Sequence, residues 1–179
     1  MKKIILILTV LLSAAWINCT VAQSPTDKLF DKYNGQDGFT TVHITQELFS
    51  LFADLDSSDP EAAEMKEMMS QLKYIRILMY EIGEDGNQAD LDAFRSQLKS
   101  LNTQGFSELM VVKEKDEEVK FLALKSGDRI SELLLFINEP GEAGFISIVG
   151  NIDINTVSKL SKTMNIQGMD NLNKLEDEK

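Results

Sequence analysis

The stretch from Phe106 to Gly150 reads FSELMVVKEKDEEVKFLALKSGDRISELLLFINEPGEAGFISIVG, and four apolar runs in it are separated by short polar connections. The runs are 106–114, 119–124, 130–138 and 144–150. Lys115-Asp116-Glu117 and Ser126-Gly127-Asp128 are connections of the length that closes an antiparallel hairpin. The stretch therefore predicts four consecutive antiparallel strands that form the body of a sheet.

The third run and the turn after it give the strongest local signals. Residues 133–137 are apolar at every position, which favours a strand that is covered on both faces inside the sheet. In Asn138-Glu139-Pro140-Gly141, proline presets the φ of the second turn position and glycine accepts a positive φ at the third. This is the pattern of a type II turn that returns the chain antiparallel.

The segments before and after this stretch alternate between helical and extended patterns. Helices are predicted over 26–33, after Thr45, from Asp59-Pro60-Glu61 onward, over about 89–101 and over roughly 156–164, and strands are predicted over 39–44 and 74–81. Strands and helices in this order predict an α+β fold. We expect a two-layer sandwich, with a mostly antiparallel sheet of about six strands and helices packed mainly on one face.

The N-terminus has the layout of a secretory signal peptide. Lys2 and Lys3 precede an apolar core over 4–12 and a small-residue region that ends at Ala22. The predicted organisation is a signal peptide over 1–22, one α+β domain over 23–169 and a flexible acidic tail over 170–179, which places the mature protein in the periplasm or cell envelope. A lipid anchor at Cys19 is the alternative, although Trp16-Ile17-Asn18 lacks the small residue that a lipoprotein signal has before its cysteine.

The charge of the chain limits its partners. The whole sequence has 18 basic and 29 acidic residues, and loss of Lys2 and Lys3 with the signal would change the formal charge from −11 to −13. Nucleic acids and anionic membrane surfaces require a basic face, so neither is expected as a partner. An envelope protein or a small ligand remains as the expected partner, and the sequence does not indicate the oligomeric state.

The chain resembles the DUF4252 domain proteins of Bacteroidetes. The resemblance rests on the short signal, the strand from Tyr74 to Tyr80 with the acidic glycine loop after it, and the junction over 145–153, FISIVGNID. It implies an exported envelope protein, similar in some members to lipoproteins, and it brings no catalytic residues.

Residues with the potential for catalysis or metal binding are few. His43 is the only histidine, and the only cysteine lies in the predicted signal, which leaves no ligand set for the common zinc sites. His43 lies in a predicted strand, where a polar sheet-face residue is the simpler interpretation than a general base. The acidic run over 113–118 lacks the register of a calcium loop, and the glycines form no phosphate-binding pattern. We therefore expect no metal, no cofactor and no catalytic residue.

The strand over 74–81 suggests where a binding surface would lie. Tyr74, Arg76 and Tyr80 alternate with an aliphatic side made of Ile75, Ile77 and Met79, which is the natural side to bury against helices. Aromatic residues and arginine are enriched at binding surfaces, so Tyr74, Arg76, Tyr80 and His43 are the candidate binding residues of a non-catalytic interaction module. These residues can equally underlie a helix. The alternative function is an envelope enzyme, a hydrolase with a carboxylate site.

Export predicts that the mature chain lacks residues 1–22. Intact-mass analysis of the protein from its native cell should give the mass of residues 23–179. A chain that begins at a lipid-modified Cys19 would establish the lipoprotein alternative, and an uncleaved Met1 would contradict export.

Overall fold

The computed structural model describes residues 24–53, 60–83 and 87–153. The predicted signal peptide, Cys19, the helix predicted over 156–164 and the tail over 170–179 lie outside the described residues.

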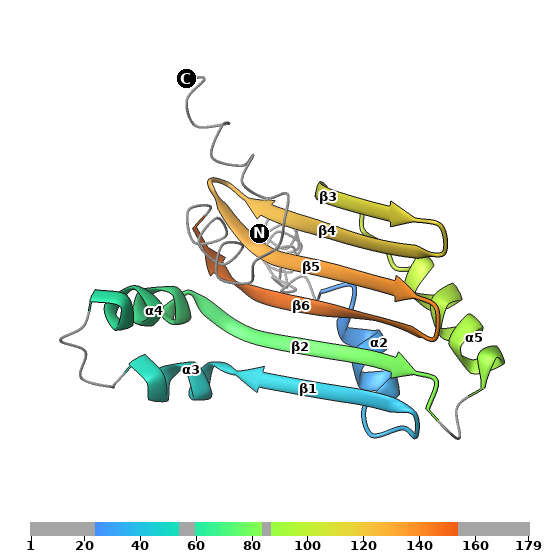
Figure 1. Cartoon of the computed structure of the whole chain (residues 1–179). Coiled ribbons are helices and arrows are strands. Elements are labelled where there is room, and N and C mark those ends of the chain that lie inside the picture. Colours follow the sequence, from blue (N-terminus) through green and yellow to red (C-terminus); the bar gives the residue numbers. More distant parts are fainter. Residues whose placement is uncertain (1–23, 54–59, 84–86, 154–179) are drawn as a thin grey trace, which may run out of the picture.

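The described chain forms one six-stranded sheet and four short helices (Figure 1). The helices are α2 (Asp27–Tyr33), α3 (Gln46–Ala53), α4 (Pro60–Ser70) and α5 (Gln88–Lys99). The strands are β1 (Phe39–Thr45), β2 (Leu72–Glu81), β3 (Phe106–Glu114), β4 (Glu117–Ser126), β5 (Arg129–Glu139) and β6 (Glu142–Ile152). All neighbouring strands are antiparallel and their order is β1-β2-β6-β5-β4-β3. The predicted α+β class and the predicted number of strands are confirmed.

Strands β3 to β6 form a meander of hairpins with two-residue turns. Glu139 pairs with Glu142, and Gly141 between them has φ of +92°, as the predicted type II turn requires. The other two turns are shorter than expected, because the polar residues at the ends of β4 continue the pairing. Glu117 pairs with Glu114, and Ser126 pairs with Arg129. Polar and charged side chains can occupy the ends of a strand at the margin of the sheet, because alternate side chains there point into solvent.

Strand β5 lies inside the sheet, between β6 and β4, as its apolar run predicts. Leu133 and Leu134 point to opposite faces and are almost fully buried, at 1% and 0% exposure. Farther along the strand, Leu135 and Ile137 are only half-buried. The prediction of cover on both faces therefore holds for one end of β5 and not for the other.

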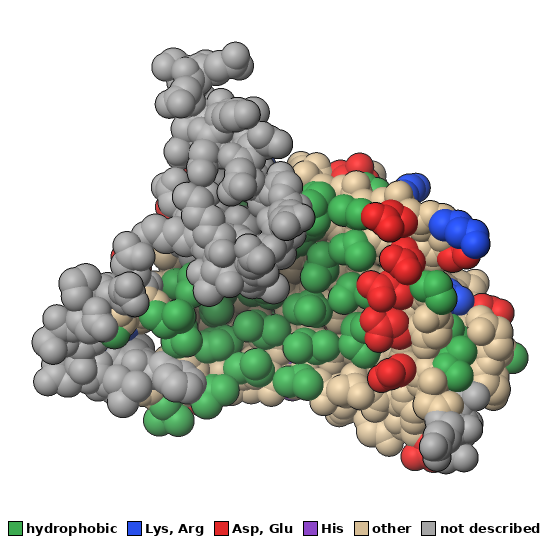
Figure 2. Space-filling model, viewed as in Figure 1, with side chains coloured by type: hydrophobic (Ala, Val, Ile, Leu, Met, Phe, Trp, Pro, Cys, Tyr) green, Lys and Arg blue, Asp and Glu red, His purple; other side chains and the backbone are tan. Residues whose placement is uncertain are grey.

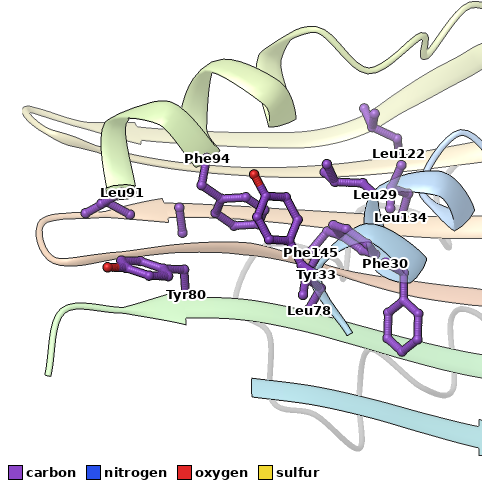
Figure 3. Packing of buried hydrophobic residues seen from close by; sticks show 11 residues of the cluster. Leu29, Phe30, Tyr33, Leu78, Tyr80, Leu91, Phe94, Leu122, Leu134 and Phe145 are labelled. Atoms are coloured by element: carbon purple, nitrogen blue, oxygen red, sulfur yellow. The ribbon is translucent and has the colours of Figure 1, made fainter. Parts of the chain in front are cut away.

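Helices α2 and α5 cover one face of the sheet and lie behind it in Figure 1. Helix α2 contacts β1 and β2, and α5 contacts β2 and β6. The core between helices and sheet is shown in Figure 3, and its buried members are Leu29, Phe30, Tyr33, Leu78, Tyr80, Leu91, Phe94, Leu122, Leu134, Ala143 and Phe145. Phe94 of α5 is central to it, because its ring meets those of Tyr33 and Phe39 edge to face, at centroid distances of 5.2 and 5.0 Å.

Helices α3 and α4 contribute to a second core cluster at one end of the sheet. Phe49 of α3 is buried there, and Met69 of α4 packs against the same cluster. Leu133 and Ala123 belong to it as well, and their side chains lie on the face opposite α2 and α5. The second face of the sheet is therefore covered only in part by the described helices.

Replacing Leu134 by aspartate should prevent stable folding. The side chain is fully buried in the core, and an unpaired buried carboxylate costs several kcal/mol against a total stability of about 5–15 kcal/mol. Thermal melts followed by circular dichroism would measure the loss. Ser107→Asp, on an exposed position of the edge strand β3, introduces the same side chain and should melt close to the parent. A Leu134→Asp variant that melts within a few degrees of the parent would contradict the central position of β5.

Candidate functional site

The four residues predicted to form a binding surface share one face of the sheet. Tyr74, Arg76 and Tyr80 alternate along β2, and His43 on the edge strand β1 pairs with Arg76. The predicted alternation of β2 is therefore confirmed. The face that they share is the one on which α2 and α5 pack, because it also carries the core residues Leu78 and Phe145.

Helix α2 covers most of these side chains. Tyr80 is 3% exposed, Tyr74 is half-buried, and Nη1 of Arg76 donates to Oδ1 of Asp27 in α2 at 2.6 Å. The guanidinium also lies over the rings of Phe30 and Tyr74, at 5.0 and 4.9 Å from the centroids. Burial, reinforced by the charge of Asp27, raises the pKa of Tyr74 to about 12. Tyr74 and Arg76 therefore hold α2 to the sheet, whereas the ring of Tyr80 lies beside those of Phe39 and of Phe94 in α5.

His43 is the one exposed member of the set. Its ring lies 5.9 Å from those of Phe30 and Tyr74 and closes the outer end of the packed aromatic group. Of the four residues, only His43 and parts of Tyr74 and Arg76 remain accessible. Their predicted binding role stays a prediction that this packing does not favour.

A buried polar cluster beside α2 is the feature that the sequence did not indicate. Glu132 of β5 is 3% exposed, and its Oε1 accepts hydrogen bonds from Oγ of Ser24 at 2.6 Å and from Oγ of Ser147 at 2.7 Å. Thr26, fully buried, is 2.6 Å from Oγ of Ser24. Burial raises the pKa of Glu132, although both serine hydrogen bonds oppose the shift. The one signal that the sequence offered was the position of Glu132 directly before the apolar run over 133–137.

The cluster does not have the arrangement of a nucleophilic catalytic site. A serine nucleophile needs a base that accepts its proton and a third group that orients that base. Here one carboxylate accepts from two serines, and Asp27, the second carboxylate nearby, is paired with Arg76. His43, on β1, lies beside the rings of Phe30 and Tyr74 instead. The hydrogen bonds instead attach residues 24–27 to the middle of the sheet.

The face opposite α2 and α5 is aliphatic and largely open, which reverses the sequence-based expectation. Ile75, Ile77 and Met79 were expected to be the side of β2 that helices bury, yet they are only half-buried and point away from α2 and α5. The aromatic side could pack under helices because Oδ1 of Asp27 accepts hydrogen bonds from Oη of Tyr74 and Nη1 of Arg76. Figure 2 shows hydrophobic side chains gathered on the face turned to the viewer.

The open aliphatic face extends over all six strands. By register its members are Val42 and Ile44 of β1, Ile75, Ile77 and Met79 of β2, Ile146 and Ile148 of β6, Leu135 and Ile137 of β5, Val119 and Phe121 of β4, and Met110 and Val112 of β3. Leu133 and Ala123 lie on the same side but are buried in the second core cluster. Most members of the open aliphatic face are half-buried, and Val42 and Val112 at its two edges are 37% and 43% exposed. An apolar surface of this continuity is typical of an interaction site.

A row of glutamates borders the open aliphatic face at one end. Glu81 and Glu139 each pair with Glu142, and Glu114 pairs with Glu117. The pairing of Glu118 with Asn138 places Glu117 beside Glu139, so the glutamate row crosses five strands. Figure 2 shows acidic side chains in a line along that margin. Like charges directly opposite each other destabilise a sheet, so the row carries an energetic cost.

Metal binding has no support in the described segments. No group of three or more histidine, cysteine, aspartate or glutamate side chains there is placed to hold an ion. Glu118, in the acidic run over 113–118, instead pairs with Lys113 at 2.8 Å and Lys120 at 3.3 Å. Within residues 24–53, 60–83 and 87–153, no helix is both long and apolar enough to span a membrane.

Comparison with known proteins identifies one family. A family model described as "Domain of unknown function (DUF4252)" matches residues 33–160. No curated protein and no solved structure matches the chain.

Replacing Glu132 by glutamine should change how stability depends on pH. A carboxyl group whose pKa is raised by folding costs stability above its folded pKa, and this cost disappears below its unfolded pKa of about 4.3. Glutamine keeps the acceptor for Ser24 and Ser147 without the buried charge. The Tm of Glu132→Gln relative to the parent should therefore rise by a few degrees between about pH 4.5 and pH 7.

Glu108→Gln is the matched control, because Glu108 is an exposed residue of β3. Its Tm relative to the parent should show little dependence on pH. If the Tm difference for Glu132→Gln is the same at both pH values, Glu132 is not a destabilised buried charge.

Proposed function

The chain belongs to the DUF4252 family, and we propose that its domain is a non-catalytic interaction module that binds a partner protein through the open aliphatic face. The single observation that carries this proposal is that this face keeps partly exposed apolar side chains on all six strands, whereas α2 and α5 cover the other side. The predicted role as a binding module is kept, but its surface moves to the face opposite Tyr74, Arg76 and Tyr80.

The packing of α2 and α5 indicates the shape of the partner. Both helices lie on their side of the sheet through apolar residues, such as Phe30 of α2 and Phe94 of α5. The open aliphatic face presents β-branched and leucine side chains on neighbouring strands, as the helix-covered face presents its own apolar residues. An amphipathic helix of a partner that packed on it would give three layers: the helices α2 and α5, the sheet, and the partner helix. Burial of apolar side chains at about 25 cal/mol per Å² would provide most of the binding free energy.

The glutamate row indicates the charge of the partner. Five carboxylates lie at one margin of the open aliphatic face, in a chain of formal charge −11. Lysine or arginine residues at one end of the partner segment would relieve the repulsion within the row and set the direction of docking. The proposed partner is therefore an amphipathic helical segment with a basic end.

The location of the protein is part of the proposal. The signal-like sequence over 1–22 supports export to the periplasm or cell envelope, with a lipid anchor at Cys19 as the alternative. The alternative function, a hydrolase with a carboxylate site, would have to use Glu132 with Ser24 and Ser147. The hydrogen bonds of Glu132 and the ion pair of Asp27 instead favour a structural role for these groups.

Synthetic peptides test the proposed partner chemistry. Two amphipathic helices with the same leucine face would be compared by fluorescence anisotropy, one with lysines at one end and one with glutamates there. The lysine peptide should bind and the glutamate peptide should bind at least tenfold more weakly. Ile77→Thr with Ile146→Thr should weaken binding about tenfold, because threonine keeps the branched shape but reduces apolar contact.

Two further variants test whether the glutamate row contributes to the affinity for the lysine peptide. Glu81→Gln with Glu142→Gln should lower affinity for the lysine peptide a few-fold, whereas Glu108→Gln on the opposite face should leave it unchanged. The proposal would be contradicted if the lysine peptide did not bind. It would also be contradicted if the variant with both isoleucine substitutions bound the lysine peptide as tightly as the parent does. Sedimentation of the parent as a dimer that Ile77→Thr dissociates would instead make a second copy the occupant.

A further inference from the structure

A pocket of about 130 Å³ lies on the helix-covered side of the sheet, between α5 and strands β4 and β5. Its apolar wall is formed by Leu98 and Leu101 from α5 and the segment after it, and by Leu122 and Phe136 from the strands. A dry cavity of roughly 150 Å³ in another protein accommodates one benzene ring, so this pocket has room for a ring-sized apolar group. It lies on the side of the sheet opposite the open aliphatic face.

The polar wall of the pocket is cationic in an otherwise acidic protein. Arg95, Lys99 and Lys120 line it, against one carboxylate, that of Glu118. Glu118 is already engaged by Lys113 as well as by Lys120, at 2.8 and 3.3 Å. The pocket therefore has an excess of positive charge and favours an anionic group.

Two buried polar atoms of the lining residues have no hydrogen-bond partner within the described structure. They are Nε of Arg95 and Oδ1 of Asn138. The other guanidinium nitrogens of Arg95 are engaged, since Nη2 donates to the carbonyl oxygen of Glu139 and Nη1 lies 3.4 Å from Oδ1 of Asp92. Both atoms have almost no accessible surface, so a ligand in the pocket can reach them only after the side chains of Arg95 and Asn138 shift. Buried donors and acceptors are nearly always satisfied, and the two unpaired atoms therefore favour such a shift when a ligand with matching groups enters.

We propose that this pocket binds a small carboxylate that carries a ring-sized apolar group and one hydroxyl or N–H donor. The carboxylate accepts from Nε of Arg95 and is favoured by Lys99 and Lys120, and the donor satisfies Oδ1 of Asn138. The apolar group lies against Leu98, Leu122 and Phe136. Aromatic hydroxy acids and amino-acid derivatives have this combination of groups.

The probe for this proposal is 3-phenyllactate, added to the full chain and followed by ¹H–¹⁵N correlation spectra. We expect saturable shifts confined to α5 and to the facing parts of β4 and β5, with Kd on the order of 1 mM for a ligand of this size. The methyl ester lacks the charge and should bind about tenfold more weakly. 3-Phenylpropionate lacks the hydroxyl and should also bind more weakly than 3-phenyllactate.

Arg95→Met should weaken binding of 3-phenyllactate at least tenfold, and Lys120→Met provides a second variant if Arg95→Met does not fold. Arg129→Met is the matched control, because Arg129 pairs with Asp153 near the β4–β5 turn and does not line the pocket. The proposal is overturned if no saturable shift occurs, if the shifts map elsewhere, or if the acid and its ester bind equally well. Unchanged affinity in the folded Arg95→Met or Lys120→Met variant would overturn it too.

Discussion

The sheet of this domain has two apolar faces, and the described helices cover only one of them along its length. Helices α2 and α5 pack on the aromatic face, where Phe94 meets the rings of Tyr33 and Phe39. Phe49 of α3 and Met69 of α4 reach only one end of the other face. Every remaining feature depends on this unequal cover, because it determines which strand residues form core and which remain available to a partner.

Much of the fold could be predicted from local sequence patterns, while the orientation of the sheet could not. The hairpin signals at Pro140-Gly141 and around Gly127 fix the antiparallel meander, and the spacing of Leu91 and Phe94 fixes a face of α5. Hydrophobicity alone ranks Ile75, Ile77 and Met79 above Tyr74 and Arg76 for burial, and this ranking was misleading. It could not include Asp27, which is distant in sequence and satisfies the polar ends of that face.

The polar cluster and the pocket were not predictable for a related reason. Glu132, Ser147 and Ser24 come from segments up to 108 residues apart, and only the pairing of β5 with β6 and the position of residues 24–27 bring them together. The pocket likewise combines α5 with β4 and β5. A glutamate directly before an apolar run, such as Glu132, is a detectable signal, but it indicates a buried carboxylate without identifying its partners.

The strand order has a consequence for how the chain reaches this structure. Within the meander, strands β3 to β6 pair with their sequence neighbours through two-residue turns, and such contacts form at little cost in loop entropy. Strand β2, in contrast, pairs with β6, and α5 and three strands of the meander separate the two in the sequence. We therefore expect the meander to form early, with the addition of β1 and β2 as the slow step that sets the folding rate.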